Sequence, residues 1–151
     1  MDTVKVQNFL RENPADEFPR FTPIASNECA KLRTEIAKRF GLNAESEPLD
    51  VLNALRSTAM FVPGVDGGDA FQLRNLISRL GIKARAEVLV NWYRFDSIDR
   101  IAFSDLSEHF DDIWYPGSDD IEIFDEGLDW FVLVRHDGQV SAVNLCGHRS
   151  G

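Results

Sequence analysis

Apolar residues in the first 81 positions recur every three or four residues, which is the spacing of amphipathic helices. Four helices are predicted, the first of them over 3–13, and each ends near a proline or a glycine. Ser46 and Asp69 are the expected caps of the third and fourth helices, because their oxygens can accept free N–H groups of a first turn. The expected buried faces contain Val6, Phe9 and Leu10; Cys29, Leu32, Ile36 and Phe40; Leu49, Leu52 and Leu55; and Leu73, Leu76, Ile77 and Leu80.

The pattern changes after Gly81 to short segments rich in β-branched and aromatic residues, which predict strands over 87–93, 120–124, 130–135 and 139–145. The segment 130–135 is apolar on both faces, so we expect a central strand there. Asp137-Gly138 predicts a tight hairpin before the last strand. A short helix capped by Ser104 is expected between the first two strands, whereas 63–69 is expected to be a loop.

These elements predict an α+β fold, in which N-terminal helices pack on a small, mostly antiparallel C-terminal sheet of about four strands. A length of 151 residues suits a single domain over 1–151. We expect residues 1–81 to form its mainly helical part and residues 82–151 its mainly antiparallel sheet.

Charge is concentrated in one part of the chain, although the net charge of −9 and the 27% charged residues are ordinary for a globular protein. Residues 1–95 carry 12 acidic and 13 basic side chains, and residues 131–151 carry one acidic and two basic ones. Residues 96–130 carry 12 acidic side chains against Arg100 alone, a net charge of −11. Aromatic residues interrupt this acidic segment, so we expect it to fold with its carboxylates largely on the surface.

The densest carboxylates are Asp111, Asp112, Asp119, Asp120 and Glu122. Three interpretations remain open: a solvated surface around a turn, a binding face for a protein partner, or a site for a divalent cation, which prefers oxygen ligands. Trp114 and Tyr115 lie between the two acidic pairs, and either anchor the short helix to the sheet or contact a partner. We predict no bound metal, no cofactor and no catalytic residue.

Few other residues offer recognisable chemistry. The three histidines, His109, His136 and His148, do not show the close spacing of a metal site. The N-terminus lacks a secretory pattern and no apolar stretch could cross a membrane, so we expect a cytoplasmic protein with Cys29 and Cys146 as free thiols. The acidic balance and the absence of clustered Lys and Arg argue against direct nucleic-acid binding.

The stretch HFDDIWYPGSDDIEIFDEGLDWFVLVRHDG, residues 109–138, resembles a family of small uncharacterised bacterial proteins that share a DDxWYPxSDD…W…HDG segment. The matching residues are Phe110, Asp111, Asp112, Trp114, Tyr115, Pro116, Ser118, Asp119, Asp120, Trp130 and His136. In size, acidity and sheet type the chain also resembles immunity proteins, which block toxin domains, among them the SMI1/KNR4-like group.

We therefore expect a non-catalytic, immunity-like interaction protein that binds a basic partner, such as a toxin domain, through an acidic and aromatic face. On this hypothesis Asp111, Asp112, Asp119, Asp120 and Glu122 attract the partner, and Trp114 and Tyr115 contact it. The alternative is a metal-dependent hydrolase that uses the Asp111, Asp112, Asp119 and Asp120 carboxylates, with His109 or His136 as base.

Overall fold

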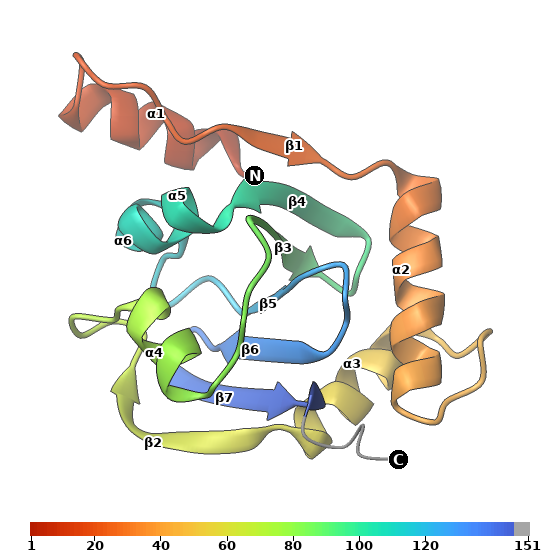
Figure 1. Ribbon diagram of the computed structural model, residues 1–151. Coiled ribbons are helices and arrows are strands. Elements are labelled where there is room, and N and C mark those ends of the chain that lie inside the picture. Colours follow the sequence, from red (N-terminus) through yellow and green to blue (C-terminus); the bar gives the residue numbers. More distant parts are fainter. Residues whose placement is uncertain (147–151) are drawn as a thin grey trace.

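Seven strands form one antiparallel sheet in the order β1-β4-β3-β5-β6-β7-β2 (Figure 1). The computed structural model describes residues 1–146. The strands are β1 (Phe21–Pro23), β2 (Met60–Asp66), β3 (Glu87–Tyr93), β4 (Ser97–Ala102), β5 (Ile121–Phe124), β6 (Trp130–Val134) and β7 (Gln139–Asn144). The helices are α1 (Thr3–Glu12), α2 (Ser26–Arg39), α3 (Pro48–Thr58), α4 (Leu73–Arg79), α5 (Phe103–Glu108) and α6 (Phe110–Ile113).

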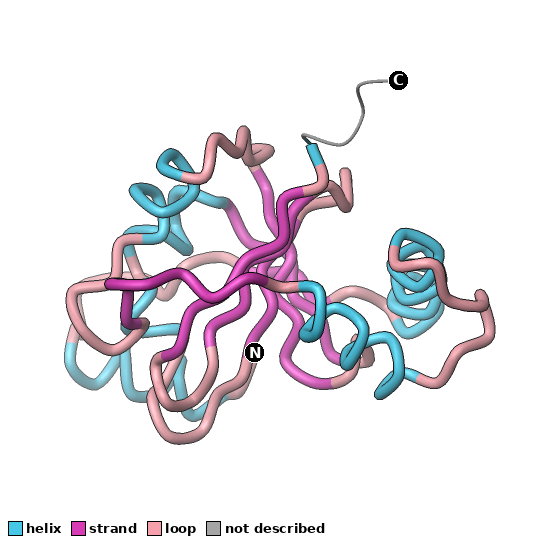
Figure 2. The backbone as a smooth tube through the Cα atoms, turned by 90° about the horizontal axis from the view of Figure 1, so that it is seen from below, coloured by secondary structure: helices cyan, strands magenta, loops and turns pink. Residues whose placement is uncertain are grey.

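Helices cover both faces of this sheet (Figure 2). The helices α2 and α3 pack on one face against side chains such as Leu89 and Phe131. The helices α4, α5 and α6 pack on the other face against side chains such as Val90 and Val132. Every residue of β5 and β6 is buried, as expected for strands that are covered on both sides.

The α+β class and the antiparallel pairing predicted from the sequence are confirmed, but the sheet has seven strands rather than about four. The additional strands are β1, β2 and β4. Two of them, β1 and β2, are the edges of the sheet and contain Pro23 and Pro63, residues that argue against a strand when only the sequence is read. The mainly helical part of the chain therefore contributes a strand to each edge of the sheet.

Several helix starts also differ from the prediction. The residue before α4 is Gln72 rather than Asp69, and the residue before α3 is Glu47 rather than Ser46; neither side chain caps its helix. The short helix that follows β4 begins at Phe103 without a serine cap and is divided at His109 into α5 and α6.

The buried face of α1 is different from the face that hydrophobicity predicts. Leu10 is 43% exposed, whereas Lys5 is 4% exposed and Phe9 5%. The lysine occupies a core position because its ammonium group has partners there, as described below. Amphipathic periodicity cannot identify a buried charge of this kind.

Two hairpin turns, between β3 and β4 and between β6 and β7, have residues in the left-handed region of the backbone. The turn at Asp137-Gly138 joins β6 to β7 as predicted, with Gly138 in the left-handed region at a φ of 89°. The turn between β3 and β4 places Arg94 and Phe95 at φ values of 47° and 59°, a conformation that is strained for large side chains. The amide oxygen of Asn91 accepts the Phe95 N–H at 2.9 Å, which holds this strained turn.

Within residues 1–146, no helix combines the length and the apolar character needed to cross a membrane. Cys29 is buried and Cys146 is exposed, and both are free thiols. Burial raises the pKa of the Cys29 thiol. The cytoplasmic location remains a prediction.

The loop that follows β2 packs closely on the core through Gly67. A methyl group at Gly67 would lie 2.6 Å from a methyl carbon of the buried Val134 and 3.4 Å from the Trp114 ring. We predict that Gly67→Ala lowers the free energy of unfolding by about 1–3 kcal/mol, since a packed interior tolerates added volume poorly. Urea denaturation measures this change.

Gly68→Ala is the matched control. Its added methyl would approach only the flexible Asp66 carboxylate, at 3.3 Å, so we expect a change within about 0.5 kcal/mol. Equal losses in the two variants would contradict the close packing of Gly67.

Candidate functional site

The segment between α6 and β5 folds back on itself, and Trp114 forms its buried base. Trp114 is 1% exposed and stacks on the ring of Phe110 with a centroid separation of 5.7 Å. Its indole N–H donates to the backbone oxygen of Asp119 at 3.0 Å. Trp114 therefore anchors the segment to the core, as one of the two interpretations of the sequence predicts, and is too deeply buried to contact a partner.

Asp119 holds the same turn from its side chain and neutralises a buried cation. Its Oδ2 accepts the Tyr115 backbone N–H at 2.8 Å and forms an ion pair with the ammonium group of Lys5. The Lys5 and Asp119 side chains are 5% and 16% exposed. This carboxylate is therefore occupied within the fold.

Lys5 reaches this position from α1 through an aromatic cage. Its Nζ donates to the Ile113 carbonyl oxygen at 2.6 Å and lies 4.3 Å from the centroid of the Tyr115 ring and 4.7 Å from that of Trp92. A cation between two ring faces gains electrostatic stabilisation in addition to its ion pair. These contacts fix α1 across the turn, and Asn8 on the next turn of α1 donates to the Tyr115 hydroxyl at 3.3 Å.

Asp120 connects the turn to the hairpin between β6 and β7. Its Oδ1 accepts the His136 backbone N–H at 2.7 Å and lies 2.9 Å from the ring Nδ1 of His136. Partial burial tends to raise the pKa of Asp120, but the hydrogen bonds and the charge of His136 outweigh that effect, so its pKa is lower than usual. The backbone oxygen of His136 also accepts the Gly117 N–H at 2.8 Å.

Glu122 is 3% exposed and cannot form part of a surface. It lies in the middle of the sheet, directly opposite Asn91 on β3, on the face that α3 covers. Burial raises the pKa of Glu122 to about 8, although the charge of Arg56 lowers it, and Asp120 adds to the increase. The expectation that Glu122 attracts a partner from the surface is therefore wrong, because the side chain faces the interior and holds a proton at neutral pH.

The helices α5 and α6 carry four carboxylates: Glu108 and Asp111 are exposed, and Asp105 and Asp112 are half-buried. Residues 103–113 contain neither Lys nor Arg. Among the described residues these four carboxylates have no Lys or Arg partner; Asp112 lies 3.5 Å from the ring of His109. We call these four side chains the acidic helix pair. Most other carboxylates of residues 96–130 are paired or buried.

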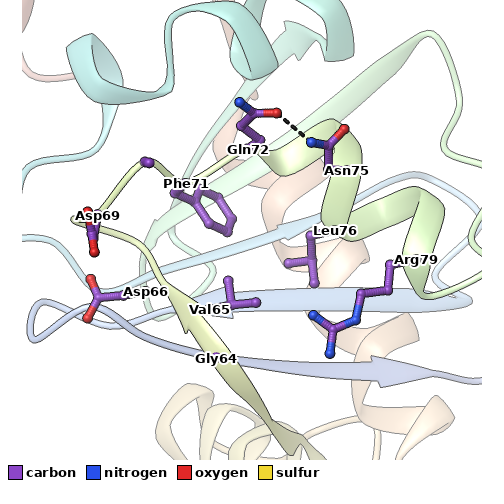
Figure 3. Close-up of a pocket in the computed structure, with 10 residues that line it drawn as sticks. Gly64, Val65, Asp66, Asp69, Phe71, Gln72, Asn75, Leu76 and Arg79 are labelled. Atoms are coloured by element: carbon purple, nitrogen blue, oxygen red, sulfur yellow. Dashed lines mark hydrogen bonds between the residues drawn. The ribbon is translucent and has the colours of Figure 1, made fainter.

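A hollow of about 290 Å³ lies beside the acidic helix pair, between β2 and α4 (Figure 3). Asp66 and Asp69 lie at one end of it and Arg79 at the other, with Phe71 between them. The Phe71 ring packs on Phe110 of α6, with centroids 4.6 Å apart. Asp66 and Asp69, both exposed, therefore extend the acidic surface beyond α6.

The carboxylates considered for a metal site are not brought together. Asp119 is paired with Lys5 and Asp120 with His136, whereas Asp111 and Asp112 belong to α6. In the part of the chain that the structure describes, no three His, Cys, Asp or Glu side chains are placed to hold a metal ion. His148 lies outside the described residues.

Comparisons with protein-family models, with curated proteins and with solved structures found no match to this chain.

Lys5 is the residue whose replacement tests the role of the turn. We predict that Lys5→Met lowers the free energy of unfolding by about 2–4 kcal/mol, because it removes a buried cation from Asp119 and from the Ile113 carbonyl. Lys31→Met removes a lysine that is 71% exposed and paired with Glu28, so its expected change is within about 0.5 kcal/mol. If chemical denaturation gave the two variants the same stability, the role of the buried Lys5 in holding the turn would be contradicted.

The buried Glu122 predicts a specific dependence of stability on pH. Between its unfolded pKa of 4.5 and its folded pKa of about 8, the native state keeps a proton that the unfolded state releases. The contribution of Glu122 to the free energy of unfolding is therefore fully present below pH 4.5. It decreases as the pH rises towards 8, by up to about 1.4 kcal/mol per pH unit.

Glu122→Gln preserves the shape of the protonated side chain and cannot ionise. We expect the variant to unfold at a higher temperature than the wild type at pH 8 and to lose this component of the pH dependence. Thermal unfolding from pH 5 to pH 9 measures both. Parallel curves for the two proteins would show that Glu122 ionises normally.

Proposed function

We propose that the protein is a non-catalytic interaction protein that binds a basic partner protein through the acidic helix pair and the neighbouring Asp66 and Asp69. The observation that supports this proposal is the uneven neutralisation of the acidic segment. Lys5, Arg33 and Arg39 from the first part of the chain pair with Asp119, Asp96 and Asp129. The acidic helix pair receives no such cation from the described residues.

A surface of this kind steers partners of opposite charge. Carboxylates that lie within a few residues on two short helices add their fields, which raises the association rate of a positively charged protein. The half-buried Tyr115 lies just after α6 and offers an aromatic contact beside the acidic side chains. A basic toxin domain, the partner class that immunity proteins bind, has the matching charge.

The binding test uses Asp111→Asn with Asp112→Asn, because these two side chains pair with no Lys or Arg among the described residues. We expect the wild type to capture a basic protein from its native cell, and we expect the double variant to associate with that purified protein about tenfold more slowly at low salt. The wild-type association rate should decrease as salt is added. Substitution of Asp119 and Asp120 would disturb the turn as well as the surface and would not be a clean test.

Glu45→Gln with Glu47→Gln is the matched control, since it removes two exposed charges between α2 and α3. It should leave the association rate nearly unchanged. An equal effect of both double variants, a rate that does not depend on salt, or the absence of a specific partner would contradict the proposal.

A further inference from the structure

A second pocket, of about 300 Å³, lies on the opposite face of the sheet, beneath α3. Its floor contains Asn91 of β3 and Glu122 of β5, which are paired in register. Its apolar wall contains Leu49 and Leu52 of α3. Arg56 of the same helix and Arg94 of the turn between β3 and β4 also line it, together with Trp92, Tyr93, Ser118 and Asp120. This volume is within the lower range of small-molecule sites.

The floor of the pocket contains a buried hydrogen-bond donor, the amide nitrogen of Asn91. Asn91 is 1% exposed, and its amide oxygen is used by the Phe95 N–H. Its amide nitrogen faces Glu122 but completes no hydrogen bond of normal geometry among the described residues. A buried donor without a partner costs about 1–3 kcal/mol, which a ligand with an acceptor atom would relieve.

The other polar groups around the pocket are also donors. Arg56 and Arg94 make no ion pair with any residue in the described part of the chain, and Arg94 lies over the Tyr93 ring at 5.1 Å. Glu122, protonated, offers a hydroxyl hydrogen. Asp120 is the main competing acceptor, and its Oδ1 is already engaged by His136. The pocket therefore has an excess of donors and of positive charge.

The strained turn keeps one of these donors in place. Arg94 and the buried Phe95 remain in the left-handed region because Asn91 holds the Phe95 N–H and the Phe95 ring packs on Phe124, with centroids 6.2 Å apart. Backbone strain of this kind is concentrated at binding and switch sites. Here the same Asn91 side chain holds the turn and forms part of the pocket floor.

We propose that this pocket binds a small organic carboxylate, whose oxygens accept hydrogen bonds from Asn91, Glu122, Arg56 and Arg94 and whose hydrocarbon part lies against Leu49 and Leu52. The paired acceptor oxygens of a carboxylate match guanidinium and amide donors. The volume limits the ligand to a short or single-ring hydrocarbon part. This site is independent of the surface in the proposed function.

The first test is a titration of the folded protein with butyrate and benzoate, observed through the backbone and side-chain amide signals of Asn91 in NMR spectra. Butyramide and benzamide serve as neutral probes of the same shape. We expect saturable shifts with at least one of the two carboxylates and much weaker shifts with its amide. The absence of saturable binding by both carboxylates, or equal binding of acid and amide, would overturn the proposal.

Two variants test the assigned donors. Arg56→Gln and Arg94→Asn should each weaken binding by about tenfold, the usual effect of losing a hydrogen bond to a charged group. Asparagine tolerates the left-handed conformation at position 94, so the second variant should fold normally. Arg74→Gln, an exposed arginine on α4 across the sheet, is the control and should bind as the wild type does. Unchanged affinity in both pocket variants would overturn the site.

The third test distinguishes the effect of Glu122 ionisation on ligand affinity from the effects of the other charged groups nearby. These groups are Arg56 on α3, Arg94, Asp120, Arg135 and His136. Between pH 7 and pH 9.5 the wild type should lose carboxylate affinity at least tenfold, because an ionised Glu122 repels the ligand. Glu122→Gln keeps a donor there and should lose less than threefold. The same loss in both proteins would show that Glu122 does not donate to the ligand.

Discussion

A chain segment with a net charge of −11 can bury its carboxylates only where they find donors or cations, and this constraint shapes the molecule. The cations come largely from outside the segment, since Lys5, Arg33 and Arg39 belong to helices α1 and α2. The ion pair of Lys5 with Asp119 is the most buried of these three. It explains why α1 packs beside α6, against the turn before β5.

This constraint divides the acidic motif into two parts, which differ in how their side chains are bonded within the fold. Trp114, Asp119 and Asp120 point inward and build a turn that is hydrogen-bonded to the hairpin of β6 and β7. Asp111 and Asp112, a few residues earlier, lie on α6, the first exposed and the second half-buried. A motif that looks uniform in sequence therefore contains one half that is bound into the fold and one half without a Lys or Arg partner among the described residues.

Sequence patterns predicted correctly the α+β class, the tight hairpin and a central strand, expected over 130–135 and found at Trp130–Val134, because these features depend on local periodicity and turn chemistry. The edge strands β1 and β2 were not predicted, because their prolines argue against strands. These segments become strands through pairing with β4 and β7, which the local sequence does not reveal. Asn91 and Arg56 carried no sequence signal of a site. Their meeting with Glu122 depends on the β3–β5 register and on the packing of α3.

The division of the acidic motif is tested most directly by urea unfolding of two double variants that remove the same charge. We expect Asp111→Asn with Asp112→Asn to keep the wild-type free energy of unfolding within about 0.5 kcal/mol, since surface charges without partners contribute little. Asp119→Asn with Asp120→Asn should lose about 3 kcal/mol or more, because it breaks the buried pair with Lys5 and the link to His136. Similar stabilities for the two variants would contradict the account.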